Sequence, residues 1–455
     1  MALPTVLLCI VLLILLISWC RLNAFLAFLL VSILAGILLG IPLNKVVASV
    51  EHGMGDTLGS LTIIIALGAM LGKLVASSGA ARTIATSLMD LFGMKYIQWA
   101  LVATGFIIGI PLFYSVGFVL MIPLIFSVVY QYKLPAVYIG LPMLAALSVT
   151  HGFLPPHPSP TALVVQFKAN MGFTLLYGLA VAVPAIIVAG PLFSMTLKKI
   201  PSIPSVLFGE NDPEGAAGIA SGNTVSGDIR SPGGLPGRFN SFGSSLLPVF
   251  MLVITGAAQY FCSGHHPLLQ SLAGFAGDPA IVMLVSLLVA AYSLGISMGK
   301  SVSQVMGIYA EAIKDIAMVL LIIAGAGALK QVLSDSGVSV VIASKLQSLK
   351  MPPLILGWLI ASILRLCVGS ATVAGLTAAG IVLPLMNVSH VNPNLMVLAI
   401  GAGSLMFSHV NDAGFWMFKE YFNLTIKDTF KSWSVMETLV GLVGLMGVLL
   451  LNRLV

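Results

Sequence analysis

The stretch "YIQWALVATGFIIGIPLFYSVGFVLMIPLIFSVV", residues 96–129, decides how this chain folds. It is apolar almost throughout, yet it is too long for one crossing of a bilayer, which takes roughly 20 residues, and too short for two crossings with a turn. Gly109, Pro111 and Gly117 interrupt it near the middle and oppose a continuous helix. The pattern favours two half-helices that enter and leave the membrane by one face, a re-entrant hairpin. Two tilted or kinked helices are the alternative.

A second stretch of the same kind occupies residues 352–386, and its middle, "VGSATVAG" (368–375), is small and hydroxyl-rich. Unpaired backbone groups in hydrocarbon each cost several kcal/mol, so the tip of such a hairpin must face protein or a water-filled cavity. We therefore expect both tips in the interior of the molecule.

The composition agrees with a membrane location for the rest of the chain. Of its 455 residues, 58% are hydrophobic and only 8% are charged, with a mean hydropathy of +1.08, whereas soluble domains are about 25% charged. These values predict an all-α polytopic membrane protein. Separate spans are expected at residues 3–19, 22–40, 57–72, 172–194, 244–262 and 280–296, with more downstream.

The chain divides into two halves of similar layout. Residues 200–243 are rich in Gly, Ser, Pro and Asn and predict a flexible linker between a first half, 1–199, and a second half, 244–455. "LGAMLGKLVASSG" (67–79) resembles "AGAGALKQVLSDSG" (324–337). With five full crossings and one hairpin in each half, the second half lies upside down relative to the first. Such inverted repeats are typical of secondary transporters.

Each half contains one further break. "THGFLPPHPSPT" (150–161) has four prolines in six positions, and "SHVNDAGF" (408–415) occupies the corresponding place in the second half. Interrupted helices in mid-membrane free backbone groups, and the helix amino termini that follow them suit an anion. We expect the four interrupted stretches to converge on one polar site near the bilayer midplane.

Polar side chains in these stretches are the candidate site residues. The expected anion-binding residues are Ser115, His157, Arg365, Gly369, Ser370, Thr372 and Asn411. Asp412 is the first choice for carrying a proton, together with His157 and His151. Arg365 admits two interpretations: bidentate pairing with a substrate carboxylate, or snorkelling to the interface or pairing with a nearby acid.

Basic residues and cysteines give the remaining expectations. The net charge of +6 reflects loop topology rather than nucleic-acid binding, and the positive-inside rule puts the amino terminus outside, in the periplasm, and the 200–243 linker in the cytoplasm. The four cysteines have no disulfide or metal spacing. No metal or cofactor is predicted.

Four motifs together resemble one family. "GIPLFYSVGFVLMIPL" (109–124), "PPHPSPT" (155–161), "GSATVAGLTAAGIVLP" (369–384) and "SHVNDAGFWMFKEYF" (408–422) resemble the gluconate:proton symporter family. The resemblance implies a homodimeric carrier in the bacterial inner membrane that works as an elevator, in which a transport domain bearing the hairpins moves against a dimeric scaffold. Ser115 departs from the family pattern, which commonly has an acidic residue after the aromatic pair.

The charge of the cargo makes a coupling ion necessary. Moving one anion into a cell against the membrane potential costs about 2.3 kcal/mol per 100 mV, so a cation must accompany it. A proton is expected, and sodium is open. Rival functions are a carrier of another small anion such as glycerate or serine, a channel, and an intramembrane metal enzyme using His151, His157 and Asp412. The sequence shows no nucleotide-binding loop, so ATP-driven transport is not expected.

Overall fold

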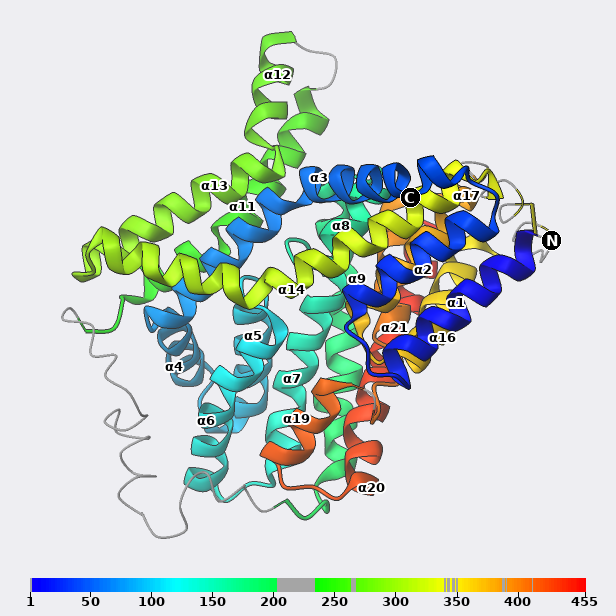
Figure 1. Ribbon diagram of the computed structural model, residues 1–455. Helices are drawn as coiled ribbons and strands as arrows, with labels where there is room; N and C mark the ends of the chain where they lie inside the picture. The colour runs from blue at the N-terminus through cyan, green and yellow to red at the C-terminus, as the bar shows by residue number, and fades with distance from the viewer. Residues whose placement is uncertain are drawn as a thin grey trace.

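The computed structural model describes residues 2–202, 234–262, 267–338, 351–386, 391–410 and 412–455, with single positions at 341, 344, 345, 348 and 389. Within these residues all regular structure is helical (Figure 1). Seven of the helices are long and apolar enough to cross a membrane, or eight if α4 and the bent segment after it form one broken span. The predicted all-α polytopic membrane protein is confirmed.

The first half contains nine α-helices in the described residues. They are α1 (Ala2–Ser18), α2 (Ala24–Leu38), α3 (Leu43–Ser77), α4 (Ala80–Phe92), α5 (Ile97–Gly109), α6 (Tyr114–Tyr132), α7 (Ala136–Phe153), α8 (Pro158–Gln166) and α9 (Met171–Ile187), with short turns η1 (Met94–Tyr96), η2 (Val188–Leu192) and η3 (Met195–Leu197). Helix α4 meets η1 and α5 at a bend of 110°.

The second half also contains a long helix, two shorter helices separated by a glycine, and a broken crossing, in this order. Its described elements are α11 (Arg238–Cys262), α12 (Pro267–Ala276), α13 (Pro279–Ala290), η5 (Ala291–Gly295), η6 (Ile296–Met298), α14 (Val302–Asp335), α16 (Pro353–Val368), α17 (Ala371–Met386), α18 (Pro393–Ser404), α19 (Ala413–Tyr421), α20 (Ile426–Thr429), η7 (Phe430–Ser434) and α21 (Val435–Leu451). A long helix, α3 or α14, precedes the predicted hairpin in each half, and a broken crossing follows the hairpin. The inverted orientation of the halves stays a prediction.

All six spans expected from hydropathy are helical, but two helices begin earlier than predicted. Helix α3 starts at Leu43 rather than at residue 57, because its polar first part still buries Val46, Val50 and Gly53 on one face. Helix α11 starts at Arg238, inside the expected linker. Of that linker, residues 203–233 lie outside the described part.

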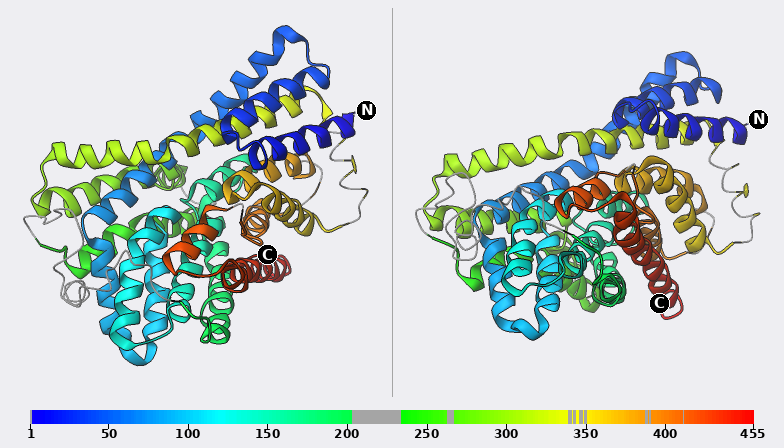
Figure 2. Two further views of the ribbon diagram at one scale, coloured as in Figure 1. Left: turned by 60° about the horizontal axis from the view of Figure 1, so that its bottom comes forward. Right: turned by 90° about the horizontal axis from the view of Figure 1, so that it is seen from below.

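Helices α3 and α14 pack closely against each other at small residues. They have 35 and 34 residues, about 50 Å each at 1.5 Å per residue. A Cβ on Gly53 would come within 2.5 Å of the Gly327 carbonyl, and one on Gly327 within 2.2 Å of the Thr57 hydroxyl. Figure 2 shows α1, α2, α14 and the first part of α3 along one side, with most of the other helices below them.

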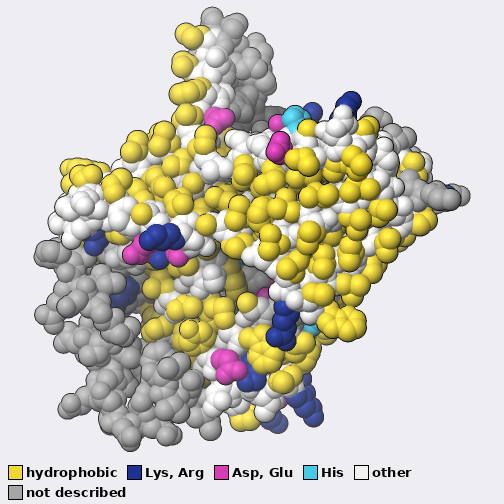
Figure 3. Space-filling model, viewed as in Figure 1, with side chains coloured by type: hydrophobic (Ala, Val, Ile, Leu, Met, Phe, Trp, Pro, Cys, Tyr) yellow, Lys and Arg dark blue, Asp and Glu magenta, His cyan; other side chains and the backbone are white. Residues whose placement is uncertain are grey.

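A broad apolar face covers this layer (Figure 3). On α1, Leu7, Leu8 and Val11 are more than half exposed, and on α2 Leu30 and Ile37 are 54% and 45% exposed. Soluble proteins rarely expose such contiguous apolar surface. This face is therefore suited to contact with lipid.

The helices break where the sequence predicts. Gly369 and Ser370 separate α16 from α17, and Gly369 has φ +76°, a left-handed conformation that glycine adopts without strain. Residues 110–113 separate α5 from α6, and Gly72 of α3 lets this first tip approach so closely that a Cβ there would lie 2.2 Å from the Pro111 carbonyl. Helices α16 and α17 have 16 residues each, about 24 Å, which is short for a 30 Å hydrocarbon core. Re-entrance of the two hairpins stays a prediction.

Candidate functional site

The second interrupted crossing runs from α18 to α19 through residues 405–412. Asp412 ends the break as the N-cap of α19, and its Oδ1 accepts a hydrogen bond from the Gly414 amide at 3.1 Å. The cap satisfies one of the backbone donors at the start of the helix, which explains why α19 begins at Ala413. It also fixes the carboxylate in the interior, because the side chain of Asp412 is only 16% exposed.

Arg365 of α16 joins this break to the tip of the second hairpin. One terminal nitrogen of its guanidinium donates to Asp412 Oδ2 and the other donates to the Gly369 carbonyl. The side chain is 4% exposed, so Arg365 does not snorkel to the interface and instead forms the ion pair that the sequence left as an alternative. His409 makes a second contact between the break and α16: its Nε2–H donates to the Leu366 carbonyl at 2.9 Å.

A chain of hydrogen bonds continues from Asp412 into the last helix. The Ser408 hydroxyl donates to Asp412 Oδ2, and Trp433 of η7 donates its Nε1–H to the Ser408 hydroxyl at 2.8 Å. The hydroxyl of Ser434 donates to the Ser408 carbonyl. Trp433 is 1% exposed, and its contacts show that η7 holds the break in place.

The first half contributes aromatic and imidazole groups to the same region. His157, in the break between α7 and α8, donates its Nε2–H to the Gly109 carbonyl at 2.6 Å and so ties that break to the first hairpin. The His151 ring lies edge-on to His157, with centroids 5.2 Å apart. Tyr114, at the start of α6, lies 5.9 Å from His151 and 6.2 Å from Trp433 between ring centroids. The four interrupted stretches thus meet in one place.

Several buried polar atoms in this region have no hydrogen-bond partner among the residues that the structure describes. They are Tyr114 Oη, His151 Nδ1 and Arg365 Nε, with Ser159 Oγ and Thr161 Oγ1 on the neighbouring α8. Folded proteins satisfy the large majority of buried polar groups, so unsatisfied ones require an explanation. A small ligand rich in oxygen atoms would satisfy them, because guanidinium, hydroxyl and imidazole groups all bond to carboxylate or hydroxyl oxygens.

Glu437 is a buried carboxylate that the sequence reasoning missed. It lies on α21, is 2% exposed, and accepts a hydrogen bond from the Ser148 hydroxyl of α7 at 2.9 Å. It is close enough to Arg365 and Asp412 to interact electrostatically with both. The available signal was an acidic residue inside an apolar helix, which by itself suggests a functional site.

A family model describing the GntP family permease matches residues 1–455, the whole chain. The chain belongs to the GntP permease family. It is a permease and not an enzyme, as the sequence predicted.

Curated relatives agree with this assignment. The permease is 47% identical over 446 residues to the "High-affinity gluconate transporter" of Escherichia coli strain K12, with 98% of each chain covered. It is 46% identical to the "Gluconate permease" of Bacillus subtilis strain 168, with 96% of each chain covered. It is 43% identical to the "Gnt-II system L-idonate transporter" of E. coli K12, covering 95% of this chain and 94% of the relative.

Two solved structures share the fold. The YdaH transporter of Alcanivorax borkumensis superposes with a TM-score of 0.64 at 17% identity, covering 94% of this chain and 97% of that one. MtrF of Neisseria gonorrhoeae gives a TM-score of 0.61 at 14% identity, covering 94% and 93%. At these identities the likeness concerns the fold alone.

The other predicted site residues of the permease lie in different settings. Ser370 uses its hydroxyl to accept from the Val373 amide at the start of α17, and Thr372 is half-buried on the same turn. Ser115 is exposed and lines a small cavity of about 90 Å³ with Lys73 and Asp315, which form an ion pair at 2.9 Å. Asn411 lies outside the described residues.

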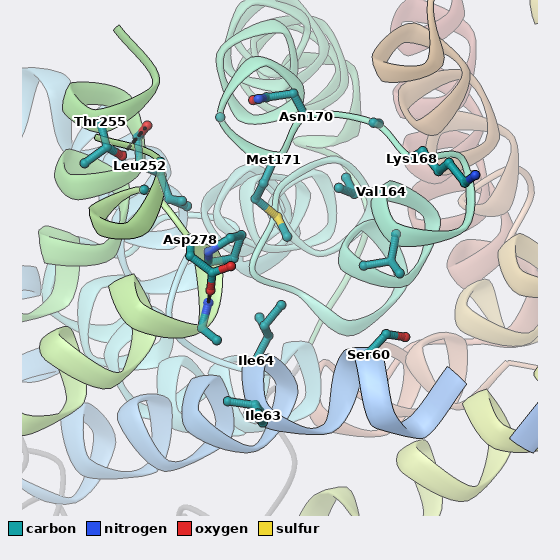
Figure 4. Close-up of a pocket in the computed structure, with 17 residues that line it drawn as sticks. Ser60, Ile63, Ile64, Val164, Lys168, Asn170, Met171, Leu252, Thr255 and Asp278 are labelled. Atoms are coloured by element: carbon teal, nitrogen blue, oxygen red, sulfur yellow. Dashed lines mark hydrogen bonds between the residues drawn. The ribbon is translucent and has the colours of Figure 1, made fainter. Parts of the chain in front are cut away.

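A larger cavity of about 500 Å³ lies elsewhere in the permease, between α3, α11 and the start of α9 (Figure 4). Its lining includes Ser60, Lys168, Asn170 and Asp278. It does not include the residues of the polar cluster described above, which are Tyr114, His151, His157, Arg365, Asp412 and Glu437. In the part of the chain that the structure describes, no group of three or more His, Cys, Asp or Glu side chains is arranged to hold a metal ion.

Proposed function

We propose that this permease is a secondary active transporter that takes up gluconate or a closely related sugar acid by symport with a proton. Its relatives named as gluconate and L-idonate transporters support this class of substrate. The observation that carries the proposal is the buried Arg365–Asp412 pair at the junction of the interrupted stretches.

The chemistry of the cluster fits a polyhydroxy anion. Arg365 supplies a positive charge and an unpartnered Nε–H that can donate to a carboxylate. Tyr114, Ser159 and Thr161 carry hydroxyls that can bond to the substrate's hydroxyls. Arg365 thus offers a donor for one carboxylate although it is paired with Asp412, and the neutral hydroxyls allow specificity by hydroxyl pattern.

Uptake into proteoliposomes tests this function. Purified permease should accumulate labelled gluconate when the lumen is more alkaline than the outside, and a protonophore should abolish the accumulation. Unlabelled idonate should compete, whereas serine and glycerate should compete less because they offer fewer hydroxyls. Equal uptake with and without the pH gradient would argue for a channel. Accumulation that needs a sodium gradient would show that the coupling ion is sodium and not a proton.

The elevator mechanism is part of the proposal, together with inverted halves, a homodimer and a periplasmic amino terminus. The recurring order of helices in the two halves and the shared fold with transporter structures support it. The first hairpin packs on α3 through Pro111 and Gly72, and an elevator would have to slide this contact.

Cross-linking tests that movement. Lys73 and Ser115 line the same small cavity, one on α3 and one on α6. In a background without native cysteines, Lys73→Cys and Ser115→Cys joined by a short reducible bifunctional thiol reagent should stop transport, and dithiothreitol should restore it. Each single variant treated with the reagent is the control. Full transport by the cross-linked protein would contradict sliding at this contact.

A further inference from the structure

We propose that Glu437 carries the coupling proton. The buried cluster of Arg365, Asp412 and Glu437 then holds either the negative charge of Glu437 or that of the substrate, but not both at once. The inference rests on the proposed proton symport and names the residue behind it. It also transfers to Glu437 a role that the sequence suggested first for Asp412.

The surroundings of Glu437 are those of a group that can gain and lose a proton. Its carboxylate is buried and, among the residues with described positions, accepts one hydrogen bond, from Ser148. Within the described residues, no lysine, arginine or histidine nitrogen lies within 4.0 Å of it. Ionised carboxylates are rarely buried without a cation because the loss of hydration is not offset, and a bound proton removes that cost.

Asp412 is placed differently, although it is only a short distance along the network. It accepts from the Arg365 guanidinium, the Ser408 hydroxyl and the Gly414 amide. Protonating Asp412 would remove the partner of a buried cation and weaken the contact between hairpin and break. Asp412 is therefore suited to positioning Arg365, and Glu437 to carrying the proton.

The groups around Glu437 decide how its protonation affects binding of an anion. Ser148 of α7 contacts it directly, and the titratable groups that interact with it electrostatically are Arg365 of α16, Asp412 before α19 and Tyr114 of α6. His151 lies one turn along α7 from Ser148. Of the other elements packed against α21, α18 and η2 carry no ionisable side chain, Tyr177 of α9 stacks on Phe173, and Lys431 of η7 is exposed.

These charges predict an order of events. With both carboxylates ionised the cluster carries one net negative charge and opposes an incoming anion. A proton taken from the outer water onto a Glu437 carboxylate oxygen makes the cluster neutral, and Arg365 is then able to attract the substrate carboxylate through its unpartnered Nε–H. On the inner side the O–H bond breaks, the proton passes to water, and the returning charge expels the anion. One proton thus accompanies each anion.

Glu437→Gln tests the assignment, because glutamine keeps the shape and can accept from Ser148 but cannot release a proton. In proteoliposomes this variant should still exchange labelled for unlabelled gluconate across the membrane. It should no longer accumulate gluconate under a pH gradient, and its exchange rate should not depend on pH. Glu420→Gln is the matched control, because Glu420 is exposed and pairs with Lys419, and it should behave as the unmodified protein.

The outcomes separate the two proposals. Accumulation by Glu437→Gln with the pH profile of the unmodified permease would overturn the inference and leave the proposed function intact. Failure of the unmodified permease to accumulate gluconate under a pH gradient would overturn the proposed function itself.

A second variant covers the case in which Glu437→Gln does not fold. Ser148→Ala removes the hydrogen bond that Ser148 donates to the carboxylate and should shift the pH midpoint of uptake. An unshifted midpoint would contradict the assignment, because a purely structural serine would change the amount of folded protein and not the pH profile.

Discussion

The two interrupted crossings share an architecture but differ in charge. In the first half, His157 ties the break to the hairpin through a neutral hydrogen bond to the Gly109 carbonyl. In the second half, Arg365 does the same through an ion pair with Asp412 and a bond to the Gly369 carbonyl. Each half therefore fastens its own hairpin to its own break, but only the second half does so with charges.

This difference shows how a duplicated fold can yield an asymmetric site. A substrate with one carboxylate and several hydroxyls is itself asymmetric, so one charged and one neutral side suit it better than two equal sides. We infer that the second half recognises the carboxylate and the first half recognises the hydroxyls. The following variants test this division of labour.

Removing the charge of the second half should have the largest effect. Arg365→Gln leaves Asp412 buried without its cation, which costs roughly 3–5 kcal/mol in comparable pairs. We expect loss of uptake and a lower unfolding temperature in detergent. Arg238→Gln is the control, because its pair with Asp90 is exposed and such pairs contribute about 0–1 kcal/mol. Arg365→Lys separates charge from geometry: normal gluconate binding by this variant would exclude a bidentate role.

Asp412→Asn should be the next most damaging. Asparagine can still cap α19 through Gly414, but a hydrogen bond to a charged group, worth about 1.5–3 kcal/mol, is replaced by a weaker one. Uptake should fall, while the pH dependence of the remaining uptake should persist if Glu437 carries the proton. Loss of the pH dependence alone would return that role to Asp412. The double variant with Arg365→Gln should be less harmful than the sum of the single ones.

His157→Ala should have a smaller effect, because it removes a neutral contact. Loss of the bond to the Gly109 carbonyl is expected to cost about 1 kcal/mol, with lower apparent affinity for gluconate and little change in pH dependence. His157→Gln, which retains a donor, should recover part of the affinity. An effect as large as that of Arg365→Gln would contradict the proposed division between charged and neutral halves.

Ser115→Ala should have the smallest effect. Ser115 is exposed and lines the cavity beside Lys73 and Asp315 rather than contacting the polar cluster. Surface substitutions of this kind usually change stability by about 0.5 kcal/mol or less. Concentration-dependent uptake should therefore match that of the unmodified permease. A large rise in the half-saturating gluconate concentration would bring Ser115 back into the substrate site.

Much of the fold could be predicted from the sequence, because a helix in lipid needs a certain apolar length and must satisfy its backbone hydrogen bonds internally. Apolar length fixed the spans, and the interruptions at Gly109–Pro111, Gly369 and Pro155–Pro156 located the breaks, since no continuous helix accommodates them. Hydropathy failed at the start of α3, where residues 43–56 are too polar for a span but continue the helix along one buried face.

The partners within the site were harder to predict. Arg365 and Asp412 were both candidate site residues, but which acid would meet the arginine depends on how the second hairpin packs against the second break, and chain order does not encode this. Glu437 and Ser148 belong to helices that looked like ordinary spans, and their contact joins residues far apart in the chain. The hydrogen bond of the Trp433 indole N–H to Ser408 likewise joins two segments whose contact the sequence does not indicate.

The crossing of α3 and α14 also constrains the order in which the protein is made. The face of α3 around Gly53 finds its partner in Gly327 of the opposite half, so it remains without that partner in the bilayer until α14 has left the ribosome and inserted. We therefore expect the first half to be unstable by itself. Co-expression of the two halves as separate polypeptides should rescue both, whereas either half alone should be degraded.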